Sequence, residues 1–159
     1  ILMPDMTLCF LIRHSAHAEV LLGYKKRGFG IGKLAGIGGK VELDETIVAA
    51  ACRELSEEIG VTAAEADLQP MGSIRFRFPS QPAWDQVVHL FVATRWQGTP
   101  QESDEMRPAW YPIDALPFAQ MWDDNRYWLP LILAGQVLQA EFTFAADNAT
   151  VSDVHFATA

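Results

Sequence analysis

The sequence predicts an α+β fold in which a mixed β-sheet packs between helices. Segments of β-type composition alternate along the chain with two helical segments, and there is no internal repeat. The chain has 159 residues, half of them hydrophobic, which suffices to bury one core of ordinary size. We therefore expect residues 1–159 to form a single domain.

Two local patterns predict the first strands and the loop that follows them. Residues 6–12 and 19–24 are rich in β-forming side chains and flank a polar turn, which predicts a β-hairpin. Residues 28–39 contain six glycines in twelve positions. So many glycines are typical of a loop that closely approaches another group, not of a regular element.

A helix is predicted over residues 47–59. Either Asp44 or Thr46 can cap its first turn, because both side chains accept a hydrogen bond from a backbone N–H group. Gly60 follows the last helical residue and suits the left-handed conformation that often ends a helix.

The second half of the chain is expected to add strands, one more helix and an acidic loop. The helix is predicted over residues 125–134, with an interruption near its start at Pro130. Residues 98–108 are predicted to form a loop rich in acidic side chains. The remaining strands are predicted at residues 73–78, 86–96, 110–113, 139–145 and 150–156.

Charge and cysteine content narrow the class of function. Twelve Lys and Arg against 20 Asp and Glu give a net charge of -8, which disfavours a surface that binds DNA or RNA. Cys9 and Cys52 lack the spacing of a metal site or a disulfide framework and indicate a reducing compartment.

The apolar segment 6–12 is too short to span a bilayer. We expect a cytoplasmic monomer that binds neither nucleic acid nor membranes.

The predicted helix over residues 47–59 carries carboxylates on one side. At 100° per residue, three glutamates lie within about 100° of one another, and the apolar residues lie on a different face. The glutamates are Glu54, Glu57 and Glu58, and the apolar residues are Val48, Cys52, Leu55 and Ile59. Taken alone, such an acidic stretch is usually a solvated face. Bound Mg²⁺ would instead offset the mutual repulsion of the carboxylates.

The residues around these glutamates complete a longer pattern. It reads G-x5-E-x7-R-E-L-x-E-E-x-G-V and consists of Gly39, Glu45, Arg53, Glu54, Leu55, Glu57, Glu58, Gly60 and Val61. Average residue frequencies give a chance match of below about one in ten million for a chain of this length. The pattern resembles the signature of the Nudix superfamily, which implies a loop-helix-loop motif within the Nudix fold.

This resemblance implies a role for each charged residue of the motif. The metals, Mg²⁺ with Mn²⁺ as a substitute, would be held by three carboxylates, Glu54, Glu57 and Glu58. Glu58 or a metal-bound hydroxide would activate water for attack on phosphorus. Glu45 and Arg53 would orient the motif through a mutual ion pair, and Gly38 would contribute a backbone carbonyl to the metal.

Residues outside the motif resemble one branch of the superfamily, the animal MutT homologues that hydrolyse oxidised purine nucleoside triphosphates. The similarity is carried by residues 21–30, 98–108, 117–118, 121–124 and 127–128. It implies Mg²⁺-dependent conversion of substrates such as 8-oxo-dGTP to the monophosphate and pyrophosphate, which removes damaged nucleotides from the precursor pool. It also implies that Glu105 is a further metal ligand or base and that Lys25 lies near the triphosphate.

The same resemblance implies a pocket for the purine base. Its lining would be Thr7, Phe29, Ala35, Gly39, Phe76, Phe78, Met106, Trp122, Asp124, Asn125, Trp128 and Phe144. Aromatic walls with a few polar groups suit a purine, which is a flat π surface with polar edges. For Phe76 and Phe78, which share one face of a predicted strand, the alternative is core packing.

Two positions depart from the pattern of that branch and leave the substrate open. Asn125 stands where a second acid is expected, so Asp124 is the single carboxylate, and Ala35 stands where an asparagine is expected. A protonated carboxyl donates a hydrogen bond that a carboxylate cannot, so both changes affect how the base edge is recognised. One alternative is a Nudix pyrophosphatase acting on ADP-ribose or a dinucleoside polyphosphate. Another is a nucleotide-sensing domain without catalysis, which the complete set of glutamates disfavours.

Overall fold

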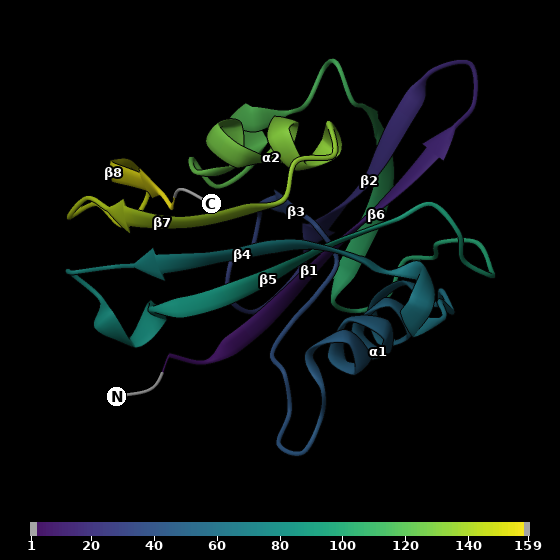
Figure 1. Ribbon diagram of the computed structural model, residues 1–159, viewed down its shortest axis with the longest axis horizontal. Helices are drawn as coiled ribbons and strands as arrows, with labels where there is room; N and C mark the ends of the chain where they lie inside the picture. The colour runs from purple at the N-terminus through teal and green to yellow at the C-terminus, as the bar shows by residue number, and fades with distance from the viewer. Residues whose placement is uncertain (1–2, 158–159) are drawn as a thin grey trace.

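The computed structural model describes residues 3–157, and in these the sheet lies between a helix on each side (Figure 1). The elements are β1 (Asp5–His14), β2 (Ala18–Lys25), β3 (Leu34–Ala35), α1 (Ile47–Ile59), β4 (Gln69–Arg77), β5 (Gln86–Ala93), β6 (Met106–Pro112), α2 (Asn125–Leu133), β7 (Leu138–Phe144) and β8 (Val151–Phe156). Single turns of 3-10 helix occur at Glu65–Asp67, Pro82–Trp84 and Phe118–Gln120. The predicted mixed sheet between helices is confirmed.

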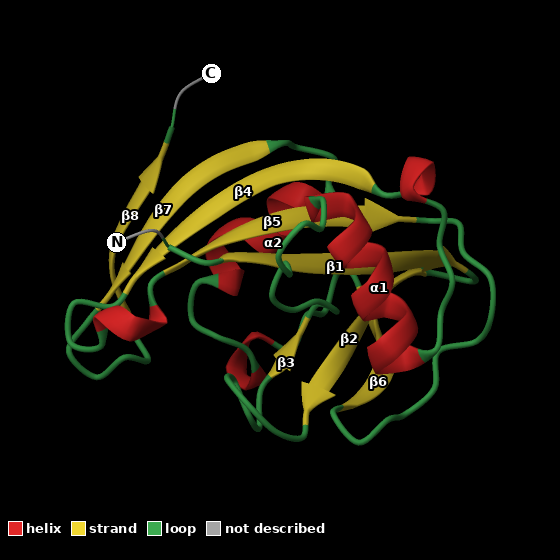
Figure 2. Ribbon diagram, turned by 90° about the horizontal axis from the view of Figure 1, so that it is seen from below, coloured by secondary structure: helices red, strands yellow, loops and turns green. Residues whose placement is uncertain are grey.

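Strand β1 joins the two halves of the sheet. The strand order is β3-β2-β1-β5-β4-β7-β8, and β6 pairs with the other edge of β2. The first part of β1 runs parallel to β5 as far as Leu11, which pairs with Ala93. From Ile12 onward β1 pairs antiparallel with β2. The strand therefore passes from one half of the sheet to the other, as the arrows of Figure 2 show.

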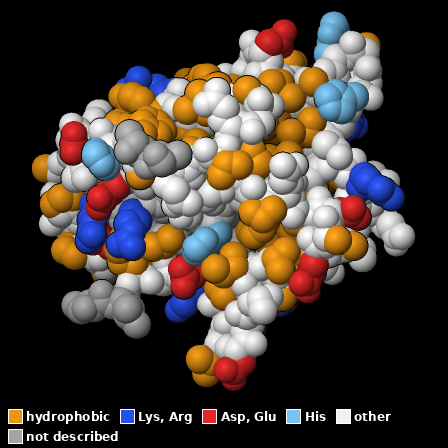
Figure 3. Space-filling view, viewed as in Figure 1, with side chains coloured by type: hydrophobic (Ala, Val, Ile, Leu, Met, Phe, Trp, Pro, Cys, Tyr) orange, Lys and Arg blue, Asp and Glu red, His pale blue; other side chains and the backbone are white. Residues whose placement is uncertain are grey.

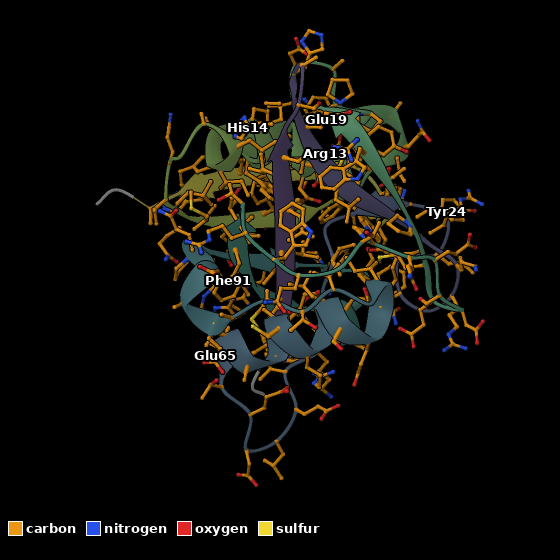
Figure 4. The ribbon with its side chains drawn as sticks, turned by 90° about the vertical axis from the view of Figure 1, so that its right-hand side faces the viewer. Arg13, His14, Glu19, Tyr24, Glu65 and Phe91 are labelled. Atoms are coloured by element: carbon orange, nitrogen blue, oxygen red, sulfur yellow. The ribbon has the colours of Figure 1, made fainter. Side chains whose placement is uncertain are left out.

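The predicted β-hairpin of β1 and β2 is confirmed. Arg13 and Glu19 are cross-strand partners near its turn, and Arg13 Nε donates to Glu19 Oε1 at 2.9 Å (Figure 4). Opposite charges on facing strands add a modest stabilisation to such a pair.

The alternation of side chains along β1 separates two hydrophobic clusters. Phe10 and Ile12 face the cluster that includes Trp128 of α2. Cys9 and Leu11 face the opposite way, into the cluster that includes Leu55 of α1. Because successive residues of a strand point to opposite faces, one buried strand can support both layers.

Helix α1 has the predicted bounds, and of the two candidate caps it uses Thr46. The Thr46 side chain accepts from the Ala49 N–H at 3.2 Å, and Gly60 adopts φ 69° at the C-terminal end. Its buried face is displaced from the predicted one, because Val48 and Cys52 are only partly buried. The buried residues are Ala50, Ala51, Glu54, Leu55, Glu58 and Ile59. Two of the acids therefore lie at the border of the packed face.

Other features also differ from the sequence prediction: β4 begins at Gln69 instead of residue 73, and β5 ends at Ala93 instead of residue 96. Strand β6 begins at Met106, not at residue 110, because Met106 pairs with Lys25 of β2. The glycine-rich loop contains the short strand β3, which pairs with β2. Helix α2 continues through Pro130 without interruption, and Ala134 N–H bonds to the Pro130 carbonyl at 3.1 Å.

No helix within residues 3–157 is both long and apolar enough to cross a bilayer.

Candidate active site

One cavity brings together residues from β1, the glycine-rich loop, β4, β5, β7 and the start of α2. Of the predicted substrate-contacting residues, those that line it are Thr7, Lys25, Phe29, Ala35, Gly39, Phe76, Phe78, Trp122, Asp124, Asn125, Trp128 and Phe144. Gly38, predicted as a metal ligand, lines it as well. The cavity is therefore assembled from segments that are far apart in the sequence.

Aromatic rings form flat walls in this cavity. Phe29 stacks on Trp122 with ring centroids 5.3 Å apart and an interplanar angle of 16°. Phe78 stacks on Phe144 at 4.6 Å and 9°, and it meets Trp122 edge-on at 6.1 Å. Phe76 and Phe78 are buried and also line the cavity, so core packing and pocket formation are not exclusive for them.

A buried carboxyl group lies at the end of the cavity formed by α2. Asp124 Oδ2 accepts a 2.7 Å hydrogen bond from the indole N–H of Trp128. Burial raises the pKa of Asp124 to about 6, although the Trp128 hydrogen bond acts in the opposite direction. Asn125 is also buried, and its Nδ2 donates to the Trp122 carbonyl at 3.1 Å. This end of the cavity thus holds one group that can change its protonation near neutral pH.

Met106 does not line the cavity, contrary to the sequence prediction. It is buried in the cluster on the α1 side of the sheet. A Cβ atom placed on Gly23 would lie 2.1 Å from the Met106 sulfur, so this side chain fills the space that Gly23 leaves on the neighbouring strand. Side chains alternate between the two faces of β6, so Met106 lies on the same face as Trp110. That face points away from the aromatic walls of the cavity.

Arg53 holds the carboxylates of the acidic helix in place. Its Nε and Nη2 donate to the two oxygens of Glu45 at 2.7 and 3.0 Å, so the predicted ion pair is present. Its Nη1 donates to Glu54 at 2.9 Å and to Glu57 at 3.1 Å. The Arg53 guanidinium keeps the pKa of Glu45 below its ordinary value. Arg53 therefore connects Glu45, in the loop before α1, to Glu54 and Glu57 of α1.

Glu58 is the least compensated carboxylate of the site. Its side chain is buried, and within the part of the chain that the structure describes its Oε2 has no hydrogen-bond partner. Burial raises the pKa of Glu58 to about 8, the Glu54 and Glu105 charges add to this, and the Lys25 charge opposes it. An isolated buried carboxylate oxygen is costly unless a proton or a cation accompanies it. The Glu58 oxygen therefore fits a cation site.

Glu105 reaches the site from the loop before β6. Its carboxylate accepts from Arg27 at 3.0 Å, and its backbone carbonyl accepts from the Lys26 N–H at 2.9 Å. Among residues 3–157, no three His, Cys, Asp or Glu side chains converge as a complete metal site. Glu57 and Glu105 instead engage Arg53 and Arg27. Carboxylate oxygens are the hard ligands that divalent cations prefer, but Glu54, Glu57 and Glu105 are each ion-paired with an arginine in this structure.

A NUDIX domain family model matches residues 3–132. The chain belongs to the Nudix family. This match includes α1 and the acids around it, and the family generally uses divalent metal ions. The sequence prediction of a Nudix hydrolase is thereby confirmed.

Individual proteins agree with this assignment. The chain is 48% identical over 133 residues to the oxidized purine nucleoside triphosphate hydrolase of Danio rerio, covering 84% of this chain and 83% of that protein. It is 45% identical over 134 residues to the enzyme of that name from Mus musculus, covering 84% of each. A crystal structure of the MutT protein from Bacillus halodurans has a TM-score of 0.80 and 22% identity over 97% of both chains, which shows the Nudix fold.

Several cavity residues of this Nudix domain escaped the sequence prediction. They are Met6, Leu8, Gly30, Lys33, Gly36, Gln86 and Val88. Lys33 carries no local signal, because it precedes β3 within the glycine-rich loop and its position depends on the pairing of β2 with β3. Gln86 and Val88 also lack one, since their position depends on the pairing of β5 with β1 and β4.

We expect the substitution Gly38→Ala to destabilise the Nudix domain by about 3 kcal/mol or more. An added Cβ at Gly38 would lie 1.7 Å from the Thr7 carbonyl oxygen, so the backbone of β1 would have to move. Thermal or urea unfolding measures the loss. The matched control is Gly32→Ala, where an added Cβ meets nothing within 4 Å and only the φ of 84° is unfavourable. Equal losses in both variants would contradict the role assigned to the Gly38 contact.

Proposed function

We propose that this Nudix hydrolase converts oxidised purine nucleoside triphosphates, such as 8-oxo-dGTP, to nucleoside monophosphate and pyrophosphate. We further propose Mg²⁺ as the cofactor, with Mn²⁺ as a substitute. The observation that carries the proposal is one cavity that contains aromatic walls, the buried Asp124 and Lys25, whose charge acts on Glu58. Identities of 48% and 45% to two oxidized purine nucleoside triphosphate hydrolases support the same substrate class.

The cavity offers separate contacts for the base and the phosphates. A purine can stack against Trp122 and Phe29, and aromatic contacts of this type are favourable for a flat π surface. Asp124 and Asn125 lie at the α2 end, where they can form hydrogen bonds with the base edge. The Lys25 ammonium can offset the negative charge of the phosphates, which the net charge of -8 otherwise opposes.

The acids of the site would hold the cation and accept a proton. Glu54, Glu57, Glu58 and Glu105, with the Gly38 carbonyl, are the proposed ligands. When bound, the cation would neutralise phosphate oxygens and lower the pKa of water. The free Oε2 of Glu58 can accept the proton of the water that attacks phosphorus in line. The anhydride P–O bond then breaks and pyrophosphate leaves. Glu45 and Arg53 would keep the acids in position.

A substrate panel tests the proposed function. In Mg²⁺ buffer, kcat/KM for pyrophosphate release should be higher for 8-oxo-dGTP than for dGTP, because the cavity offers polar groups for the changed base edge. The panel also includes 2-hydroxy-dATP, ADP-ribose and a dinucleoside polyphosphate. Equal turnover of 8-oxo-dGTP and dGTP would overturn the specificity for oxidised purines. Preferred turnover of ADP-ribose or of the dinucleoside polyphosphate would instead establish a Nudix pyrophosphatase that acts on that substrate.

We also propose that the protein acts as a cytoplasmic monomer with a single domain and binds no nucleic acid. Both cysteines are free thiols, which suits a reducing compartment. On the face seen in Figure 3, Lys and Arg side chains are scattered among acidic ones and form no continuous basic area. Light scattering of the purified protein, with and without a DNA duplex, tests the monomer and the absence of a complex.

A further inference from the structure

Two lysines lie on neighbouring segments that border the cavity. Tyr24 of β2 pairs with Leu34 of β3, and just beyond this pair the Lys25 N–H donates to the Lys33 carbonyl at 3.0 Å. Both side chains line the cavity. Two positive side chains beside one cavity suggest a ligand that offers hydrogen-bond acceptors to them.

The two ammonium groups serve different ends of the cavity. The Lys25 charge acts on Glu58 of α1, which does not itself line the cavity. Lys33 Nζ instead lies 5.0 Å from the ring centroid of Trp122, at the aromatic end. Neither lysine forms a salt bridge to any residue in the range 3–157, whereas their neighbours Lys26 and Arg27 are paired with acids. Lys33 is therefore a free hydrogen-bond donor beside the aromatic walls.

The small side chain of Ala35 leaves space in front of Lys33. Lys33 and Ala35 both line the cavity, and Leu34 between them belongs to the hydrophobic core. The methyl group of Ala35 can neither donate nor accept a hydrogen bond. The flexible stem of Lys33 can thus carry its ammonium group across this position toward a bound ring.

The other polar side chains at the aromatic end include two amides and one carboxyl group. Asn125 Nδ2 donates to the Trp122 carbonyl, and Gln86 Nε2 donates to the Trp84 carbonyl at 3.0 Å. Each amide keeps its oxygen and one N–H for a ligand, and the Asp124 carboxyl group adds acceptor oxygens. An ammonium group, by contrast, has three donors and no acceptor. Together these groups match a base edge that combines N–H donors with a carbonyl oxygen.

We propose that Lys33 is a specificity-determining residue, whose ammonium group donates a hydrogen bond to a carbonyl oxygen of the base. This inference rests on the proposed function and deepens it: the cavity selects purines that carry a keto group over adenine, which has none. Lys25 remains the cation for the phosphates, and Lys33 recognises the ring.

Nucleosides without phosphates separate recognition of the base from recognition of the phosphates. Isothermal titration of 8-oxo-2′-deoxyguanosine should show at least about tenfold weaker binding to Lys33→Met than to the unmodified protein, the scale of one hydrogen bond to a charged group. Lys33→Arg, which keeps a charged donor, should restore most of the affinity. Binding of 2′-deoxyadenosine should change little in either variant. Arg95→Met removes one charge at an exposed position outside the cavity and is the matched control.

Two results would overturn the role of Lys33. If Lys33→Met weakens binding of 8-oxo-dGTP but leaves nucleoside binding unchanged, Lys33 contacts phosphate. If both nucleosides lose affinity equally, the Lys33 stem only packs on Trp122. Absence of 8-oxo-dGTP turnover by the unmodified protein would instead overturn the proposed function, and the nucleoside titration would still report on Lys33.

Discussion

Replacing Glu58 with glutamine should lower turnover of 8-oxo-dGTP by at least about a hundredfold, the usual scale for loss of a general base. The amide keeps the size of the side chain but removes the negative charge and the site that accepts a proton. Pyrophosphate release under saturating Mg²⁺ measures the loss. The control is Glu65→Gln, which removes one charge at an exposed position beyond the end of α1 (labelled in Figure 4). Retained activity in Glu58→Gln would refute the catalytic assignment.

The same substitution should stabilise the metal-free protein at alkaline pH. The pKa of Glu58 is raised from 4.5 to about 8 in the folded state, so the folded state favours the protonated form. The stabilisation of the folded state by protonated Glu58 is fully present below pH 4.5 and is lost as the pH rises through about 8. In EDTA, the Tm of Glu58→Gln should therefore exceed that of the unmodified protein increasingly from pH 5 to 8. Added Mg²⁺ should raise the Tm of the unmodified protein more than that of the variant.

The second large effect is expected at Asp124. We expect Asp124→Asn to lower kcat/KM for 8-oxo-dGTP by roughly tenfold to a hundredfold. In the proposed function the buried Asp124 carboxyl group contacts the base edge, and asparagine replaces it with a side chain whose donors and acceptors are fixed. Asparagine can still accept the Trp128 hydrogen bond, so the fold should persist. Steady-state kinetics with 8-oxo-dGTP and dGTP gives the change in preference. A variant with unchanged preference would show that Asp124 does not recognise the base.

Asp124 should also make the preference depend on pH. Its pKa is raised to about 6, so below that pH the carboxyl group can donate a hydrogen bond and above it only accepts. The ratio of kcat/KM values for the two nucleotides should therefore change between pH 5 and 7 and stay flat in Asp124→Asn. Since the folded pKa is raised from 3.8, the stability contribution of Asp124 is present below pH 3.8 and is lost through about pH 6. Above pH 6, Asp124→Asn should therefore have a higher free energy of unfolding than the unmodified protein.

Local patterns account for what the sequence could predict. Helix α1 was predicted from its candidate caps and from Gly60 at its end, which are short-range features. The ion pair between Glu45 and Arg53 was implied by the family motif and is present. The remaining predicted cavity residues came from the similarity to the MutT homologues. No local pattern could have shown that Phe76 of β4 and Trp128 of α2 line the same cavity.

Long-range pairing accounts for what the sequence could not predict. Strand β6 begins at Met106 because it pairs with β2 from that residue onward. As a strand residue, Met106 points to the α1 side of the sheet. The hydrogen bond between the Lys25 and Lys33 backbones requires the register of β2 and β3, which is formed inside a glycine-rich segment. The tight approach of Gly38 to Thr7 likewise depends on a contact between residues distant in sequence. Composition and periodicity carry little information about such contacts.

The position of Arg53 has a consequence for the order of events in turnover. One guanidinium group contacts Glu45, Glu54 and Glu57, so its single positive charge offsets only part of the negative charge around α1 before a cation arrives. A cation that binds Glu54 or Glu57 must displace Arg53, whereas the Oε2 of Glu58, which has no hydrogen-bond partner among residues 3–157, can accept a cation directly. Under these conditions the metal is expected to enter together with its nucleotide and to leave with pyrophosphate. The kinetically competent substrate would then be the metal–nucleotide complex.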